Sequence, residues 1–200
     1  MRPSTVRGFL CIAGLGLILL GAQMGKAERN AGDSNTGPGR LLGPFADLAK
    51  DITWIAAQRA IVAGEESRAI LLAERAVSLD PRDGFGWERY GTLVGTLLAS
   101  PASEEDPAVR LAWVRAALEI FERGQERCDS PASLARIRAF YLLTRAQSDP
   151  ELPWPGGPSE PWELAAEAFE ASARLYSDSE DRAQVLLLAR EARAAAEDLR

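Results

Sequence analysis

The chain has 200 residues, of which 46% are hydrophobic, a composition that suits one ordinary domain with a flanking segment. Its formal net charge of -6 argues against nucleic acid as a partner, because binding a polyanion requires a clustered positive surface. Histidine is absent, which removes the usual general base and zinc ligand, and we expect no cofactor, no metal site and no enzymatic activity.

The chain begins with a basic flank, Arg2 and Arg7, and continues with an uncharged apolar run at 8–24. This order is typical of an export signal, and the positive flank stays in the cytoplasm. Residues 1–24 are therefore expected to be a signal peptide or a single-span membrane anchor. Seventeen residues make about 25 Å of helix, at the short limit for a bilayer core of roughly 30 Å. A retained anchor is favoured, and small-residue cleavage patterns at 20–22 and 25–27 make removal of the run the alternative.

Two locations follow from these alternatives. A retained anchor places the chain in a bacterial inner membrane, with one span and the C-terminal domain outside the cytoplasm. A cleaved signal leaves a secreted or periplasmic protein. Residues 25–43 are rich in Gly, Asn, Ser and Asp, with too little apolar surface to offset the entropy of ordering, so they are expected to be a flexible linker. The folded domain should cover 44–200.

Apolar residues recur at intervals of three or four over 45–63, which is the period of a helix. Gly64 then gives a typical helix stop. A second helix is predicted over 67–79. It should end before Pro81, because the residue that precedes a proline is pushed out of the helical region. The two helices together form a predicted helix-turn-helix unit.

This unit resembles a tetratricopeptide repeat, a pair of antiparallel helices that recurs every 34 residues. The matching positions in the first repeat are Gly64, Ala69, Ala76 and the end Leu79-Asp80-Pro81. The positions at which the next repeat restarts in phase are Trp87, Tyr90, Gly91 and Val94. Trp54 departs from the pattern, because it stands one position later than the tryptophan of the family.

Proline-bounded breaks make the later repeats irregular. The segment 100–107 interrupts the second repeat, and its second helix is expected at 108–127 instead. Another helix should begin at Ser130 and Pro131, with the serine as its cap. The segment 149–161 holds five of the twelve prolines and is predicted to be an extended, stiff connection.

Two more helices are predicted, one from Trp162 onward and an amphipathic one over 179–199. A terminal helix of this kind caps a solenoid by covering its last apolar face. The expected fold is all-α: a short irregular tetratricopeptide-like α-solenoid of about three helix pairs and a capping helix, after an N-terminal apolar helix. The expected units are 50–83, 84–130 with an insertion, 131–178 in degenerate form, and the cap 179–200.

The resemblance implies a groove lined by the first helices of successive repeats, in which an extended peptide or a partner helix lies. The groove residues carried over by position are Asp51, Trp54, Gln58 and Ile61 from the first repeat and Phe85, Glu88, Thr92 and Thr96 from the second. The displaced Trp54 has two interpretations. It is either an aromatic that contacts the ligand or a side chain buried against the preceding helix or linker.

Three other features are interpreted as structural. Trp154, between prolines, is expected to pack on the domain and fix its loop instead of docking on another protein. Cys128 is expected to be a partly buried small hydrophobe and not a reactive thiol. The acidic run 104–106 is expected to cap the next helix instead of binding a cation.

These patterns predict a membrane-tethered or exported scaffold that binds another protein and contacts the membrane through its N-terminal helix. The alternative is a structural or assembly subunit that is permanently buried in a larger envelope complex. A hydrolase with paired carboxylates is disfavoured, because such an enzyme needs a sheltered acid of raised pKa and these carboxylates fit surface or capping positions. Nothing in the sequence indicates the oligomeric state.

Overall fold

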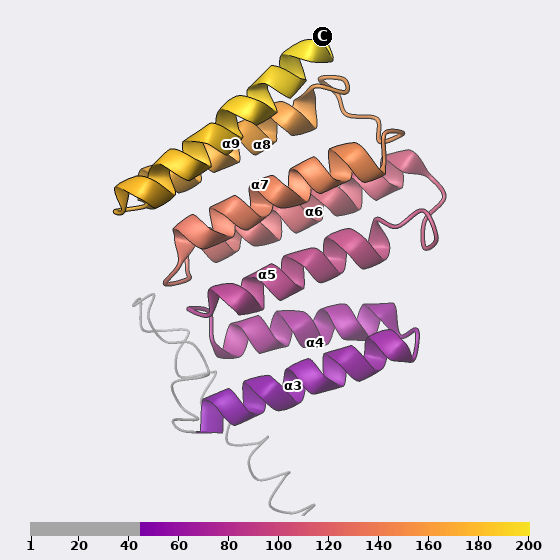
Figure 1. Ribbon diagram of the computed structural model, residues 1–200. Helices are drawn as coiled ribbons and strands as arrows, with labels where there is room; N and C mark the ends of the chain where they lie inside the picture. The colour runs from indigo at the N-terminus through magenta and orange to yellow at the C-terminus, as the bar shows by residue number, and fades with distance from the viewer. Residues whose placement is uncertain (1–44) are drawn as a thin grey trace, which may run out of the picture.

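The described part of the chain, residues 45–200 of a computed structural model, contains seven α-helices and no strand (Figure 1). The helices are α3 (Phe45–Val62), α4 (Glu66–Leu79), α5 (Gly84–Leu93), α6 (Pro107–Gln125), α7 (Pro131–Ser148), α8 (Glu160–Leu175) and α9 (Ser179–Asp198). A short π-helical segment, η2 (Val94–Leu98), continues α5. The all-α expectation is confirmed for this range. The apolar helix expected within 1–24 and the linker at 25–43 lie outside it.

Most helix ends follow the sequence signals. Gly64 has a φ of 72° in the turn after α3, a conformation that favours glycine. The Asp106 carboxylate accepts a hydrogen bond of 2.8 Å from the Ala108 N–H and so caps α6, as expected for the acidic run. Two expectations are wrong. The segment 149–161 is a series of turns and not an extended connection, and α8 begins within it at Glu160. Ser130 precedes α7 with Pro131 in its first turn, but the serine side chain makes no capping hydrogen bond.

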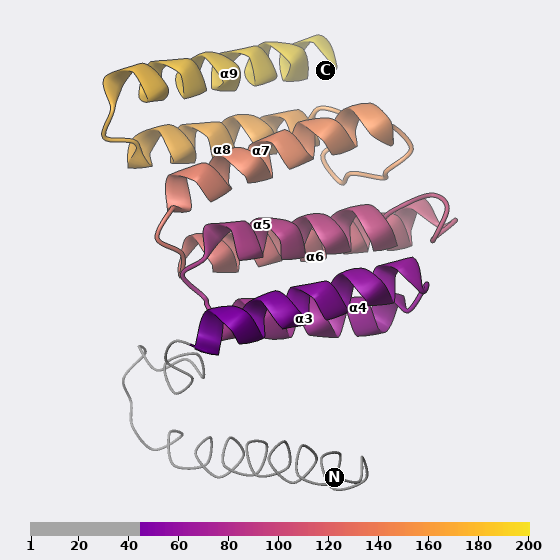
Figure 2. The same cartoon turned by 60° about the horizontal axis from the view of Figure 1, so that its bottom comes forward.

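Helices that follow one another in the chain pack against each other, and α5 also reaches α7. In Figure 2, α3 and α5 lie in front of α4 and α6. The α9 helix packs on α8 at the C-terminal end of the stack (Figure 1). Among residues 45–200, none of the helices combines the length and the apolar character that crossing a membrane would require.

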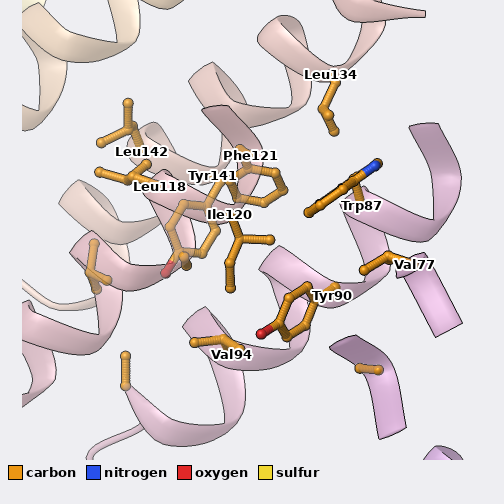
Figure 3. Packing of buried hydrophobic residues seen from close by; sticks show 14 of the residues in the cluster. Val77, Trp87, Tyr90, Val94, Leu118, Ile120, Phe121, Leu134, Tyr141 and Leu142 are labelled. Carbon is orange, nitrogen blue, oxygen red and sulfur yellow. The ribbon is translucent and has the colours of Figure 1, made fainter. Parts of the chain in front are cut away.

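The main apolar core takes side chains from every helix between α3 and α8, among them Trp87, Phe121, Leu134 and Tyr141. Figure 3 shows the Phe121 and Tyr141 rings beside each other, and their centroids are 5.6 Å apart. Burial raises the pKa of the Tyr141 hydroxyl above its ordinary value. A second cluster, centred on Phe169, joins α7, α8 and α9.

Glycines let the large rings of this core touch helix backbones. A Cβ on Gly91 would lie 2.7 Å from the Phe121 ring, and one on Gly124 would lie 2.7 Å from Trp87. The Tyr141 ring occupies the space beside Gly95, and its hydroxyl donates a hydrogen bond of 3.1 Å to the Gly95 carbonyl. The helices α5, α6 and α7 can therefore approach one another only while these positions have no side chain.

A buried ion pair fixes the two loops that the prolines predicted. The Arg110 guanidinium, 2% exposed, donates hydrogen bonds of 2.9 and 3.1 Å to the two carboxylate oxygens of Asp149. It also donates to the carbonyls of Glu104 and Glu105, at 3.3 and 2.9 Å. The hydrogen bond with Asp149 raises the pKa of Arg110. One side chain of α6 thus holds the loop before α6 and the end of α7 together.

Gly91→Ala tests the glycine contacts. We expect it to lower the free energy of unfolding by about 1–2 kcal/mol, because overpacking against Phe121 outweighs the higher helix propensity of alanine. Urea denaturation followed by circular dichroism measures the change. Gly86→Ala, also in α5, is the matched control, since its new Cβ would meet Val77 only at an ordinary distance of 3.4 Å. Equal stability of the two variants would contradict the contact.

Asp149→Ala tests the buried pair. It should lower the melting temperature markedly, because the Arg110 charge stays buried without its carboxylate. The double variant Arg110→Met/Asp149→Leu should recover much of the loss, since no charge then remains to be paired. Calorimetry of the three proteins checks both expectations. A double variant that melts no higher than Asp149→Ala would show that packing, and not charge, determines stability at this position.

Candidate partner-binding surface

Seven of the eight predicted groove residues lie on α3 and α5 and form one face of each helix, and the eighth lies in η2. On α3 the positions 51, 54, 58 and 61 are separated by three or four residues, so they share one side of the helix. Phe85, Glu88 and Thr92 do the same on α5, and Thr96 continues the row in η2. We call these two rows together the groove face.

The groove face is exposed along most of its length. Phe85, with 62% of its surface exposed, is its only large exposed aromatic. Ile61 and Glu88 are half-buried. The remaining exposed positions are Asp51, Gln58, Thr92 and Thr96. The face therefore presents one aromatic ring among carboxylate, amide and hydroxyl groups.

Trp54 is the exception, because only 7% of its surface is exposed and it belongs to the main core. The Arg89 guanidinium covers its ring, with 4.2 Å between the guanidinium carbon and the ring centroid. The same guanidinium carbon lies 5.7 Å from the centroid of the Phe85 ring. Of the two interpretations of Trp54, the geometry fits burial, although the covering group comes from α5 and not from the preceding helix or linker.

Arg89 joins the two rows of the groove face. The sequence analysis did not predict it as part of this surface. It is half-buried and lies four residues after Phe85, which places both on the same side of α5. That spacing is the one signal that could have identified it. A guanidinium stacked on a tryptophan face gains electrostatic attraction from the ring quadrupole. Arg89 therefore holds Phe85 next to the first helix.

Lys50 fixes how α3 sits against the start of α5. Its ammonium donates hydrogen bonds of 2.8 Å to Asp80 and 3.3 Å to Asp83, in the turn between α4 and α5. The hydrogen bond to Asp80 raises the pKa of Lys50, against the lowering effect of burial. Asp83 also accepts a hydrogen bond of 3.0 Å from the Phe85 N–H and caps α5. The exposed Phe85 ring is thus placed by a capped helix start that is tied to α3.

The other sequence features have structural roles. Trp154 is 8% exposed and belongs to the main core, so it packs on the domain as expected. Cys128, 9% exposed, belongs to the same core and is a buried hydrophobe as expected. Within residues 45–200, no group of three or more His, Cys, Asp or Glu side chains is arranged to hold a metal ion.

Comparison with protein-family models found no family that matches the chain. Comparison with curated proteins found no significant match either. The surface has to be interpreted from its own residues.

Arg89→Ala tests the contact between the two rows. We expect a loss of about 0.5–2 kcal/mol in the free energy of unfolding, the range of a partly desolvated cation–π contact. Arg89→Lys should recover only part of the loss, because an ammonium lacks the planar surface that stacks on Trp54. Urea denaturation measures both variants, with Gln58→Ala on the exposed part of α3 as the control. A loss for Gln58→Ala as large as that for Arg89→Ala would contradict the assignment.

Proposed function

We propose that the chain is a tetratricopeptide-like α-solenoid scaffold that binds another protein on the groove face. The pairing of successive antiparallel helices supports the solenoid. The residues that carry the resemblance support its repeat type, since Ala69 and Ala76 are fully buried where two helices pack closely, and Gly64 forms the turn between them.

The observation that carries the proposal is the arrangement of Phe85, Arg89 and Trp54. Phe85 is a large exposed ring whose backbone is fixed by a cap and whose neighbour Arg89 is stacked on a buried tryptophan. Rigid aromatic groups of this kind contribute most of the energy at protein interfaces, because little entropy is lost when they bind. Phe85 is therefore the proposed anchor.

The groups around Phe85 indicate the kind of partner. Thr92 and Thr96 are exposed on the C-terminal side of the ring, and Asp51 and Glu88 supply carboxylates on the two rows. A partner segment with an apolar residue for Phe85 and a basic residue near the carboxylates fits this chemistry. An extended peptide or one face of a helix can present such a pair.

The proposed place of action is outside the cytoplasm, on a membrane tether or after export. The basic flank and apolar run of residues 1–24 support it.

A second candidate function is that of a structural subunit in a larger envelope complex. The exposed apolar residues of α3 favour it, because surfaces of this kind are usually covered in the assembled state.

A photo-crosslinking residue at Thr92 tests the groove face in cells that express the full chain. We expect crosslinks to a partner protein at this position and none at Gln184, an exposed position of α9 that serves as the control. Phe85→Ala should reduce the crosslinked fraction at Thr92 by about tenfold, the effect of losing about 1.4 kcal/mol of binding energy. Helicity should stay unchanged, because Phe85 is mostly exposed.

Two outcomes would contradict the proposal. Equal crosslinking at Thr92 and Gln184 would show that the groove face has no special access to a partner. Unchanged crosslinking in Phe85→Ala would show that the ring is not the anchor.

A further inference from the structure

A second row of α3 is apolar and faces solvent. It consists of Phe45, Leu48, Ile52, Ile55, Arg59 and Val62, and we call it the α3 stripe. Its five apolar members are between 54% and 82% exposed. From Ile52 onward, each stripe position follows a groove-face position by one residue, so the stripe is rotated from the groove face by about 100°. The α3 stripe is therefore a separate surface.

The two ends of the helical stack differ in polarity. At the C-terminal end, α9 buries Val185, Ala189 and Ala192 against α8 and exposes Arg190 and Arg193. Within α9, Leu187 is the one large apolar residue that is exposed. An end helix of this kind needs no cover, whereas the α3 stripe exposes an apolar row that only Arg59 interrupts. The α3 end therefore has the exposed apolar character that is typical of interfaces.

The spacing of the stripe indicates what covers it. Its members are separated by three, four, three, four and three residues, which is the 3.5-residue period of a helix that packs on another helix along its length. Ala49, Ala56 and Ala63 flank the stripe on one side at intervals of seven. Small side chains there allow two backbones to come close. The occupant should therefore be a helix.

We propose that this helix is α3 of a second copy of the chain, packed antiparallel across a twofold axis. The spacing of the stripe is symmetric about the midpoint between Thr53 and Trp54. An antiparallel copy therefore sets each stripe position against another: Ile52 against the partner's Ile55, and Phe45 against the partner's Val62. A surface that matches itself in this way is what a twofold interface requires.

Charge supports the same register. Arg59, the only charged member of the stripe, would lie against the partner's Leu48, where its aliphatic stem can pack. The partner's Asp51 is three residues from that point, about 4.5 Å along the helix, within reach of the guanidinium. Both Arg59 and Asp51 are exposed. The pair forms twice in the dimer and not at all in a single copy, because Asp51 and Arg59 of one helix are about 12 Å apart.

The shape of the surface is consistent with this packing. A groove of about 540 Å³ runs along the C-terminal half of α3, lined by Ile52, Ile55, Ala56 and Arg59 and by Glu65 and Arg68 after it. In the antiparallel register the partner's Leu48 and Ile52 face this half of the helix. The groove thus takes the two aliphatic side chains that the symmetry brings to it.

Cysteine crosslinking of the full chain in detergent tests the register. In a Cys11→Ser background that keeps the buried Cys128, Phe45→Cys and Val62→Cys are made in two copies with different tags. We expect a short bismaleimide to join the two copies when they are mixed, and not to join two copies that both carry Phe45→Cys. In the antiparallel pair those two positions are about 25 Å apart.

A charge exchange tests the contact. Arg59→Asp should raise the dissociation constant of the dimer by about tenfold or more, because two carboxylates then face each other. Adding Asp51→Arg to it should restore most of the affinity. Light scattering measures the mass. Leu71→Glu, at an exposed position of α4 outside the stripe, is the control that should leave the dimer intact.

Three results would overturn the proposal. A monomeric mass for the unchanged chain would mean that its own residues 8–24, or nothing, cover the stripe. Crosslinking of Phe45→Cys to itself would show a parallel pair. A dimer that is insensitive to Arg59→Asp would place the interface elsewhere. The crosslinking test at Thr92 and Phe85 stays independent of these results, because neither residue is part of the stripe and Asp51 is the one groove-face residue that the dimer contact uses.

Discussion

The close approach of α5, α6 and α7 is the constraint on which the rest of the structure depends. Gly91, Gly95 and Gly124 leave room for the rings of Phe121, Tyr141 and Trp87 to lie directly on helix backbones. These contacts join the helices on the N-terminal side of the stack to those on its C-terminal side. The groove face depends on them too, because Phe85 and Thr92 are carried by the same helix that Gly91 brings against α6.

Charged groups fix the connections that the glycines cannot. Arg110 holds the end of α7 through Asp149 and the loop before α6 through two backbone carbonyls. Lys50 ties α3 to the turn before α5. In both cases a basic side chain within a helix bonds to carboxylates at the ends of other helices. The apolar contacts set how close the helices come, and the ion pairs set how the irregular segments between them are placed. The helical stack accommodates the insertions bounded by prolines because contacts with the Arg110 side chain hold each of them.

The sequence predicted the helices well and the faces of the helices only in part. Helix ends depend on local signals, such as Gly64 and Pro81, and these act over a few residues. Which side of α3 is buried, which belongs to the groove face and which forms the stripe depends on the helices that pack against it. Consecutive residues such as Trp54 and Ile55 differ in direction by about 100° around the helix. The Arg89 group that covers the Trp54 ring comes from α5. A pattern that shows a helix with apolar residues on more than one side does not say which side is buried.

The position of Lys50 has a practical consequence for chemical labelling. The chain contains two lysines, Lys26 and Lys50, and only the second lies in the described part of the chain. Its amine is held by two carboxylates, and its raised pKa keeps it protonated, so it is a poor nucleophile while α3 is docked. Amine-reactive reagents should therefore modify it mainly in molecules whose α3 has moved away. The rate of acylation at this one residue reports how often the first helix of the described domain separates from the next turn.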